Sequence, residues 1–295
     1  VLILCDFNTV DVGKTLVSQV YQNDALPFLT IIPPLKMHGE PLPEAITEMA
    51  RYVDVLIAPL TTNIAHTATR YEAQKSGVRV MVLPEADEKL LASEALEVDF
   101  YELRPRIEKM ADLLTKANLA RVTTSKGTDI FMKIEGRKGR ALHGFTNLDD
   151  ISAGPCLESS IAPVEGTAEG RIVVDVSIPG LGLIHDPVEI LVHQGWAKEI
   201  KGGSDARKFT DLLESKKDPN IYNIAELGVG MNPKCKAVGS MLLDEGAQGT
   251  IHIALGTNAY IGGKVKASGH YDVLVLNPTL ELDGVAIVKD GKLNF

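Results

Sequence analysis

Cysteine is scarce in this sequence. The 295 residues include only three cysteines, Cys5, Cys156 and Cys235, which lie far apart and form no CxxC pair. Such scattered cysteines exclude a disulfide framework, and a reducing cytoplasmic environment is the expectation that follows.

Positive charge and long apolar runs are also lacking. Lysine and arginine number 30 against 39 aspartates and glutamates, which gives a formal net charge of -9 and a pI of about 5.3. This balance argues against a general nucleic-acid or anionic-membrane binder. No apolar run approaches the roughly 20 residues that span a bilayer, and the chain opens on a strand-like segment instead of a charged signal region. We therefore expect neither nucleic acid nor membrane as a partner.

Apolar residues are plentiful enough to build a large core. They make up 45% of the chain, and the mean hydropathy is +0.05. A chain of this length exceeds one ordinary domain and fits one large domain or two modest ones.

The first 120 residues alternate between short apolar runs and segments of helical spacing. Strands are predicted at residues 1–5, 28–32, 53–58 and 78–83, and helices at 11–22, 44–51, 65–75 and 107–117. Continuous apolar strands that alternate with helices are typical of a parallel sheet covered on both faces. We predict a doubly wound α/β domain of the Rossmann or flavodoxin-like kind over residues 1–120.

One segment of this half resembles a phosphate-binding loop. Val12-Gly-Lys-Thr15 follows a predicted strand, but Asn8 stands where the full motif requires its first glycine. Without a glycine-rich backbone to surround a phosphate, an ordinary helix start is the better interpretation.

The pattern changes near residue 120. Short strands joined by polar or glycine turns replace the alternation, with strands predicted at 121–125, 129–135, 171–176, 187–192, 285–288 and 292–295 and one helix at 206–214. This pattern favours an α+β domain over residues 121–295.

Imidazole and carboxylate side chains gather between residues 223 and 272. His252 stands inside the apolar run 250–255, which is predicted to be a strand. His270 and Asp272 are two residues apart in a second strand, so their side chains point to the same face and can reach one point. Each feature alone is also common in proteins without a metal, and it is their co-occurrence that indicates a metal site.

Two glutamates strengthen this hypothesis. Glu226 lies in an apolar run beside Gly228 and Gly230, and Glu158 lies just before another apolar run. A buried glutamate needs a partner or a metal. Imidazole and carboxylate ligands suit zinc, cobalt, manganese and iron(II).

These motifs resemble the metallo-aminopeptidases of the aminopeptidase T and aminopeptidase S type. The resemblance rests on NIAELGVGMNP around Glu226, GTIHIALG around His252, HYDVLV at His270 and PCLESSIAPVEGTAEG around Glu158, and it covers most of residues 127–295.

The resemblance implies a metalloprotease with two zinc, cobalt or manganese ions and a peptide substrate. The residues that it assigns to the metals are Glu158, Glu226, Glu245, His252, His270 and Asp272. Glu158 is also assigned a catalytic role, and Tyr260 is a candidate donor to the oxyanion. The spacing differs from the family pattern at Glu245, by two residues, and at Tyr260, by one. A homodimer is implied as well.

The same superfamily includes shorter proteins of the 2,5-dihydroxypyridine 5,6-dioxygenase type, which open a ring with one iron(II). His252, His270 and Asp272 would supply their two-histidine, one-carboxylate centre. The retention of both glutamates favours an aminopeptidase, a hydrolase, as the main prediction, whereas the short chain favours the dioxygenase alternative. A non-catalytic metal-binding protein is the third hypothesis. All three predict a metal-binding protein, and the two enzymes would act on a small peptide or another small molecule.

Overall fold

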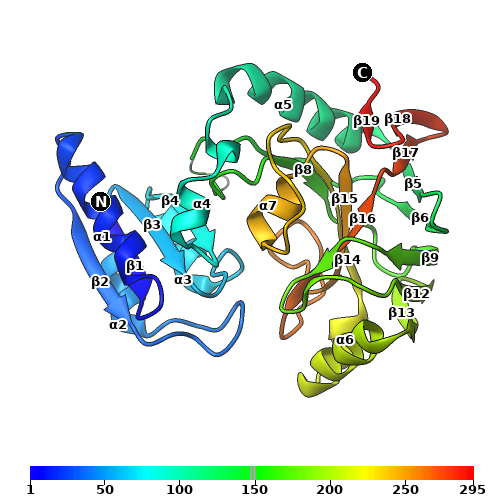
Figure 1. Cartoon of the computed structure of the whole chain (residues 1–295), viewed down its shortest axis with the longest axis horizontal. Helices are drawn as coiled ribbons and strands as arrows, with labels where there is room; N and C mark the ends of the chain where they lie inside the picture. The colour runs from blue at the N-terminus through cyan, green and yellow to red at the C-terminus, as the bar shows by residue number, and fades with distance from the viewer. Residues whose placement is uncertain (147, 149–150) are drawn as a thin grey trace. The chain divides into compact units, whose positions relative to one another are not determined.

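The computed structural model describes residues 1–146, 148 and 151–295. The chain divides into two compact units, which Figure 1 shows in sequence colours. Unit 1 comprises Val1–Glu97 and Gly144–Pro155, and unit 2 comprises Val98–His143 and Cys156–Phe295. The chain therefore leaves unit 1, enters unit 2, and returns once before completing unit 2.

Unit 1 is built on four parallel strands. They are β1 (Leu2–Asp6), β2 (Phe28–Ile32), β3 (Val55–Leu60) and β4 (Arg79–Pro84), in the spatial order β2-β1-β3-β4. Every residue of β1 is buried, as expected of a central strand covered on both faces. The parallel sheet predicted for the first half of the chain is confirmed.

Helices α1, α2 and α3 join these strands, and α4 and η1 follow β4. Their bounds are Val10–Gln22 for α1, Glu44–Ala50 for α2, Ala68–Lys75 for α3, Glu88–Leu91 for α4 and Glu94–Leu96 for the 3-10 turn η1. Gly13 lies where α1 packs on β1, and a Cβ added to it would meet Cys5 Sγ at 2.9 Å. Lys14 pairs with Asp11 on the exposed side of the helix. The glycine of the phosphate-loop-like segment is thus explained by helix–strand packing.

Unit 2 contains two larger antiparallel sheets and a two-stranded ribbon. The eight-stranded sheet has the order β13-β12-β9-β6-β5-β17-β18-β19. Its strands are Leu119–Thr123 (β5), Asp129–Lys133 (β6), Glu169–Val174 (β9), Val188–His193 (β12), Trp196–Gly202 (β13), Thr279–Leu282 (β17), Val285–Lys289 (β18) and Lys292–Leu293 (β19). The ribbon pairs β10 (Ser177–Ile178) with β11 (Gly182–Leu183). Together with the helices below, these sheets agree with the predicted α+β class.

The five-stranded sheet has the order β16-β15-β14-β8-β7. Its strands are Arg140–Leu142 (β7), Glu158–Ile161 (β8), Ile224–Gly230 (β14), Thr250–Gly256 (β15) and His270–Leu276 (β16). Alternate residues of the long strands, such as Leu227, Ile253 and Val273, belong to the hydrophobic core. The opposite face carries the candidate site.

Four helical segments complete unit 2. They are α5 (Phe100–Lys116), α6 (Ser204–Ser215), α7 (Met241–Gly246) and the 3-10 turn η2 (Pro219–Tyr222). Helix α5 begins before the predicted start at residue 107, because Asp99 caps it by accepting N–H bonds from Tyr101 and Glu102, and Pro105 lies inside the helix. Phe209 of α6 is fully buried in the core.

None of the helices in the described part of the chain combines the length and the apolar character needed to cross a lipid bilayer.

Candidate metal centre

Five of the predicted site residues lie on one face of the five-stranded sheet. They are Glu158 on β8, Glu226 on β14, His252 on β15, and His270 and Asp272 on β16. Residues directly paired across strands share a face. The register pairs Glu158 with Gly230, Gly228 with His252, Glu226 with Ala254, Ala254 with Asp272, and Gly256 with His270. Four neighbouring strands therefore contribute charged side chains to a surface whose other positions are mostly glycine or alanine.

Gly228 makes room for the His252 ring. It pairs with His252 on one side and with Ser160 on the other. A Cβ added to Gly228 would lie 1.9 Å from Nε2 and 2.1 Å from Cε1 of His252. The imidazole thus occupies the space that any larger residue at position 228 would fill.

His270 is oriented by a backbone carbonyl. Its Nδ1 lies 2.8 Å from the carbonyl oxygen of Thr257. Because a carbonyl oxygen can only accept, Nδ1 carries the hydrogen, and Nε2 faces the site. That nitrogen lies 3.0 Å from Glu226 Oε2 and 3.4 Å from Asp272 Oδ1. A lone pair this close to carboxylate oxygens requires a proton or a metal cation between them.

His252 faces the carboxylate of Asp272 from the neighbouring strand β15. Its Nε2 lies 3.5 Å from Glu158 Oε2 and 3.9 Å from Asp272 Oδ1. Within the described residues, Asp272 Oδ1 and His252 Nδ1 are buried atoms that lack a hydrogen-bond partner. Buried polar atoms normally find a partner, and Asp272 Oδ1 faces the Nε2 atoms of both histidines, so this oxygen indicates that the site is completed by something outside the chain.

The geometry fits a divalent metal. Two donors, each about 2.1 Å from one ion, lie at most about 4.2 Å apart, and each of the four distances given above satisfies this limit for its own pair of atoms, whereas His252 and His270 belong to different groups of ligand atoms. Two groups of side chains keep their ligand atoms within 4.8 Å of one another, namely Glu158, Glu226 and His252, and Glu226, His270 and Asp272. Their nitrogen and oxygen donors suit iron(II), zinc, cobalt and manganese.

Burial and charge shift the pKa values in opposite directions. Burial raises the pKa of Glu158 to about 7, although the charge of His252 works against this. Burial also raises the pKa of Glu226, but its hydrogen bond and attraction to His270 more than offset this and leave the pKa below its usual value. Burial lowers the pKa of His270, whereas the charge of Asp272 raises it, and the net pKa lies well above the ordinary value. A bound metal would compete with this proton for the same lone pair.

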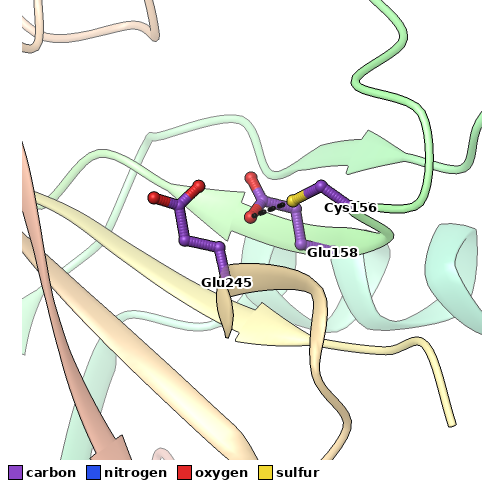
Figure 2. A group of neighbouring side chains, drawn as sticks. All are labelled: Cys156, Glu158 and Glu245. Atoms are coloured by element: carbon purple, nitrogen blue, oxygen red, sulfur yellow. Dashed lines mark hydrogen bonds between the residues drawn. The ribbon is translucent and has the colours of Figure 1, made fainter. Parts of the chain in front are cut away.

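A second group of side chains adjoins Glu158. Figure 2 shows Glu158 between Glu245 of α7 on one side and Cys156 on the other. The thiol of Cys156 donates to Glu158 Oε2 over 3.7 Å, and the ligand atoms of the three residues lie within 4.8 Å of one another. Burial raises the pKa of Cys156 well above its usual value, so the thiol acts here as a hydrogen-bond donor. Despite its unusual spacing in the sequence, Glu245 lies next to the predicted ligands.

Tyr260 has a different environment. It lies in the loop between β15 and β16 with 42% of its surface exposed. Its predicted role as an oxyanion donor depended on peptide hydrolysis.

Sequence reasoning missed Arg140. Its Nη1 lies 3.5 Å from Glu226 Oε1, although the two residues are 86 positions apart. Arg140 belongs to the short edge strand β7, and no local signal in the sequence connects that strand with Glu226.

The comparisons with known proteins agree on one family. The family model described as "2,5-dihydroxypyridine 5,6-dioxygenase" (NicX) matches residues 37–295. The chain belongs to this family. A 2,5-dihydroxypyridine 5,6-dioxygenase of Pseudomonas putida is 25% identical over 246 residues, which cover 78% of this chain and 69% of that protein.

Two solved structures share the fold. The 2,5-dihydroxypyridine dioxygenase from P. putida KT2440 matches with a TM-score of 0.83 at 20% identity, over 99% of this chain and 91% of that chain. Wild-type AmpT from Thermus thermophilus matches with a TM-score of 0.67 at 15% identity, over 100% and 94% of the two chains. The part of the resemblance that concerns the NicX family is confirmed, and the structure of AmpT shares the fold of this chain.

The prediction of an aminopeptidase is wrong. The family model, the curated relative and the structure of the P. putida dioxygenase all indicate the dioxygenase that was the alternative. The error has a physical cause, because a set of carboxylates and imidazoles on one sheet supports either chemistry, and fold does not determine function. The expectation of a metal-binding enzyme stands, while the terms hydrolase and metalloprotease do not.

Proposed function

We propose that this chain is an iron(II)-dependent dioxygenase that opens the ring of 2,5-dihydroxypyridine or of a closely related hydroxypyridine. Membership in the NicX family supports the reaction. The observation that carries the proposal is the position of Asp272 Oδ1, a buried atom within 3.4 Å and 3.9 Å of the Nε2 atoms of His270 and His252.

His252, His270 and Asp272 are the proposed ligands. Two imidazoles and one carboxylate form the ligand set of non-haem iron(II) oxygenases, which leaves coordination positions open. When bound, the iron supplies those open positions and the redox chemistry that joins oxygen to a hydroxylated ring.

The chain itself orients the proposed ligands and keeps water away from them. The carbonyl of Thr257 fixes the tautomer of His270, and Gly228 fixes the space for His252. The side chains of His252, His270 and Asp272 are only 2%, 9% and 11% exposed, so the chain itself keeps most water away from them. A site of this kind holds its ligands in place before the substrate arrives.

Glu158 and Glu226 are assigned as groups beside the iron ligands. Glu226 is held by Arg140 and His270, and Glu158 by the thiol of Cys156. We assign to these carboxylates the orientation of the imidazoles and the acceptance of protons from the substrate hydroxyls.

The proposal is tested by oxygen consumption. Protein purified anaerobically and loaded with iron(II) is mixed with 2,5-dihydroxypyridine in an oxygen electrode, and the loss of the aromatic absorbance is followed in parallel. We expect one iron per chain and equal consumption of oxygen and substrate. 2-Hydroxypyridine, which lacks the second hydroxyl, serves as the matched substrate control. An iron-loaded protein that consumes no oxygen with any dihydroxypyridine would overturn the proposal.

A further inference from the structure

The loop of residues 257–269 connects the two strands that carry the proposed ligands. It begins directly after β15, which bears His252, and ends at His270. Because the Thr257 carbonyl accepts the Nδ1 hydrogen of His270, the orientation of that imidazole depends on the peptide group between Thr257 and Asn258.

This peptide group is held at both ends. A peptide is planar, so the Thr257 carbonyl and the Asn258 N–H point in opposite directions. The Asn258 N–H donates to the carbonyl of Val265 over 3.0 Å, and the Val265 N–H donates to Asn258 Oδ1 over 2.9 Å. The Asn258 side chain, 1% exposed, therefore joins the two arms of the loop beside the carbonyl that orients His270.

Glu165 anchors this arrangement from another part of the chain. It lies between β8 and β9, and its Oε1 accepts from Asn258 Nδ2 at 3.1 Å and from the Lys264 N–H at 2.7 Å. Its Oε2 pairs with the guanidinium of Arg137, which also donates to the carbonyl of Gly262. A single carboxylate thus connects three points of the loop to the body of unit 2.

We propose that Glu165 is a positioning residue for the metal centre, acting through Asn258 and the Thr257 carbonyl on His270. The link to catalysis rests on the proposed function, whereas the link to metal binding stands by itself. Groups that orient a metal-ligating histidine contribute about 10- to 100-fold to metal affinity. Since Glu165 acts one layer further out, we expect an effect near the lower end, about tenfold.

Metal affinity is measured by titrating the metal-free full-length protein with cobalt(II). Glu165→Ala removes the acceptor and should weaken cobalt binding about tenfold. Glu165→Gln keeps an oxygen that can accept from Asn258 and Lys264, and should restore most of the affinity.

Glu169→Ala is the matched control. Glu169 also accepts a backbone N–H, from Gln194 at 2.8 Å, and pairs with His193, but these bonds hold the turn between β12 and β13. The side chains of Glu165 and Glu169 are 22% and 31% exposed. The control should lose hydrogen bonds without a change in cobalt affinity.

A nuclear magnetic resonance signal separates positioning from a general loss of stability. The Nδ1 hydrogen of His270 should give a slowly exchanging imidazole resonance in the zinc-loaded parent and in Glu169→Ala, identified by its absence in His270→Ala. In Glu165→Ala this resonance should exchange rapidly or disappear. Asn258→Ala tests the same connection from the loop side if Glu165→Ala does not fold, and should give the same result.

The inference would be overturned if Glu165→Ala kept both its cobalt affinity and its His270 resonance. Where Asn258→Ala replaces that variant, the same result in Asn258→Ala would overturn it. If instead the parent binds metal but consumes no oxygen with dihydroxypyridines, the proposed function fails, and the result for Glu165 remains decided by the cobalt and resonance measurements.

Discussion

Replacing Gly228 by alanine is the sharpest perturbation of the proposed iron site. The added Cβ would lie 1.9 Å from His252 Nε2, 2.1 Å from Cε1 and 2.7 Å from Cδ2. Gly228 has no left-handed backbone conformation, so alanine meets no strain of its own, and the whole effect comes from the collision with the ring.

The size of the effect follows from the distance. To restore an ordinary contact of about 3.4 Å, the imidazole and the strand must separate by about 1.5 Å. His252 is 2% exposed and has little room for this movement. Overpacking of this kind costs about 1–3 kcal/mol of unfolding free energy. A displacement of about 1 Å at a reacting centre costs about 100-fold in rate, so we expect at least that loss.

The assay compares iron affinity, oxygen consumption and thermal unfolding of Gly228→Ala with those of Gly203→Ala. At Gly203 an added Cβ would meet the carboxylate of Asp186 at 2.4 Å, outside the proposed site. Gly203→Ala should keep its iron affinity. The reasoning would be refuted by a folded Gly228→Ala protein with parental iron affinity and turnover, because the position of the His252 ring would then not matter.

Three further predictions concern the ligands, the metal and the core, and one concerns assembly. Asp272→Asn keeps the volume of the side chain but removes the anionic ligand, so turnover should fall by more than about 100-fold, with Asp186→Asn as the control in the same oxygen assay. Chelation should lower the melting temperature of the protein, since a metal at 100 times its Kd contributes about 2.7 kcal/mol; His252→Ala protein should show a much smaller shift, and equal shifts would count against the site. Phe209→Ala should lower the free energy of unfolding in urea by about 3–5 kcal/mol, because Phe209 is fully buried and packs edge-to-face on Tyr271, the residue between the two ligands of β16. The half-exposed Phe131 is the control, and its change to alanine should alter that free energy by no more than about 0.5 kcal/mol. The homodimer implied by the superfamily stays a prediction, and light scattering that finds only single chains would contradict it.

Periodicity predicted much of the fold. In the first half, the apolar run predicted as a strand at residues 1–5 nearly coincides with β1, because a central strand of a parallel sheet is buried on both faces. The predicted start of α5 at residue 107 is seven residues too late, because the cap at Asp99 lets the helix begin at Phe100. The return of residues 144–155 to unit 1 could not be predicted, because it depends on long-range packing.

The candidate site was predictable in its residue types but not in its environment. The spacing of two between His270 and Asp272 predicts that they share one face of a strand. The apolar surroundings of Glu226 predict that this glutamate needs a partner or a metal. The contacts of Arg140 and Glu165 were not predictable, because each reaches its partner across 86 or more positions of the chain. The spacing of these residues could not distinguish hydrolysis from oxygenation either, because both reactions use the same types of metal ligand.

Anomalous diffraction at the iron edge, from crystals grown anaerobically with iron(II), tests the central claim most directly. The account predicts one iron peak per chain, within bonding distance of His252 Nε2, His270 Nε2 and Asp272 Oδ1. A peak among Cys156, Glu158 and Glu245 instead, or no peak on this face of the five-stranded sheet, would contradict it.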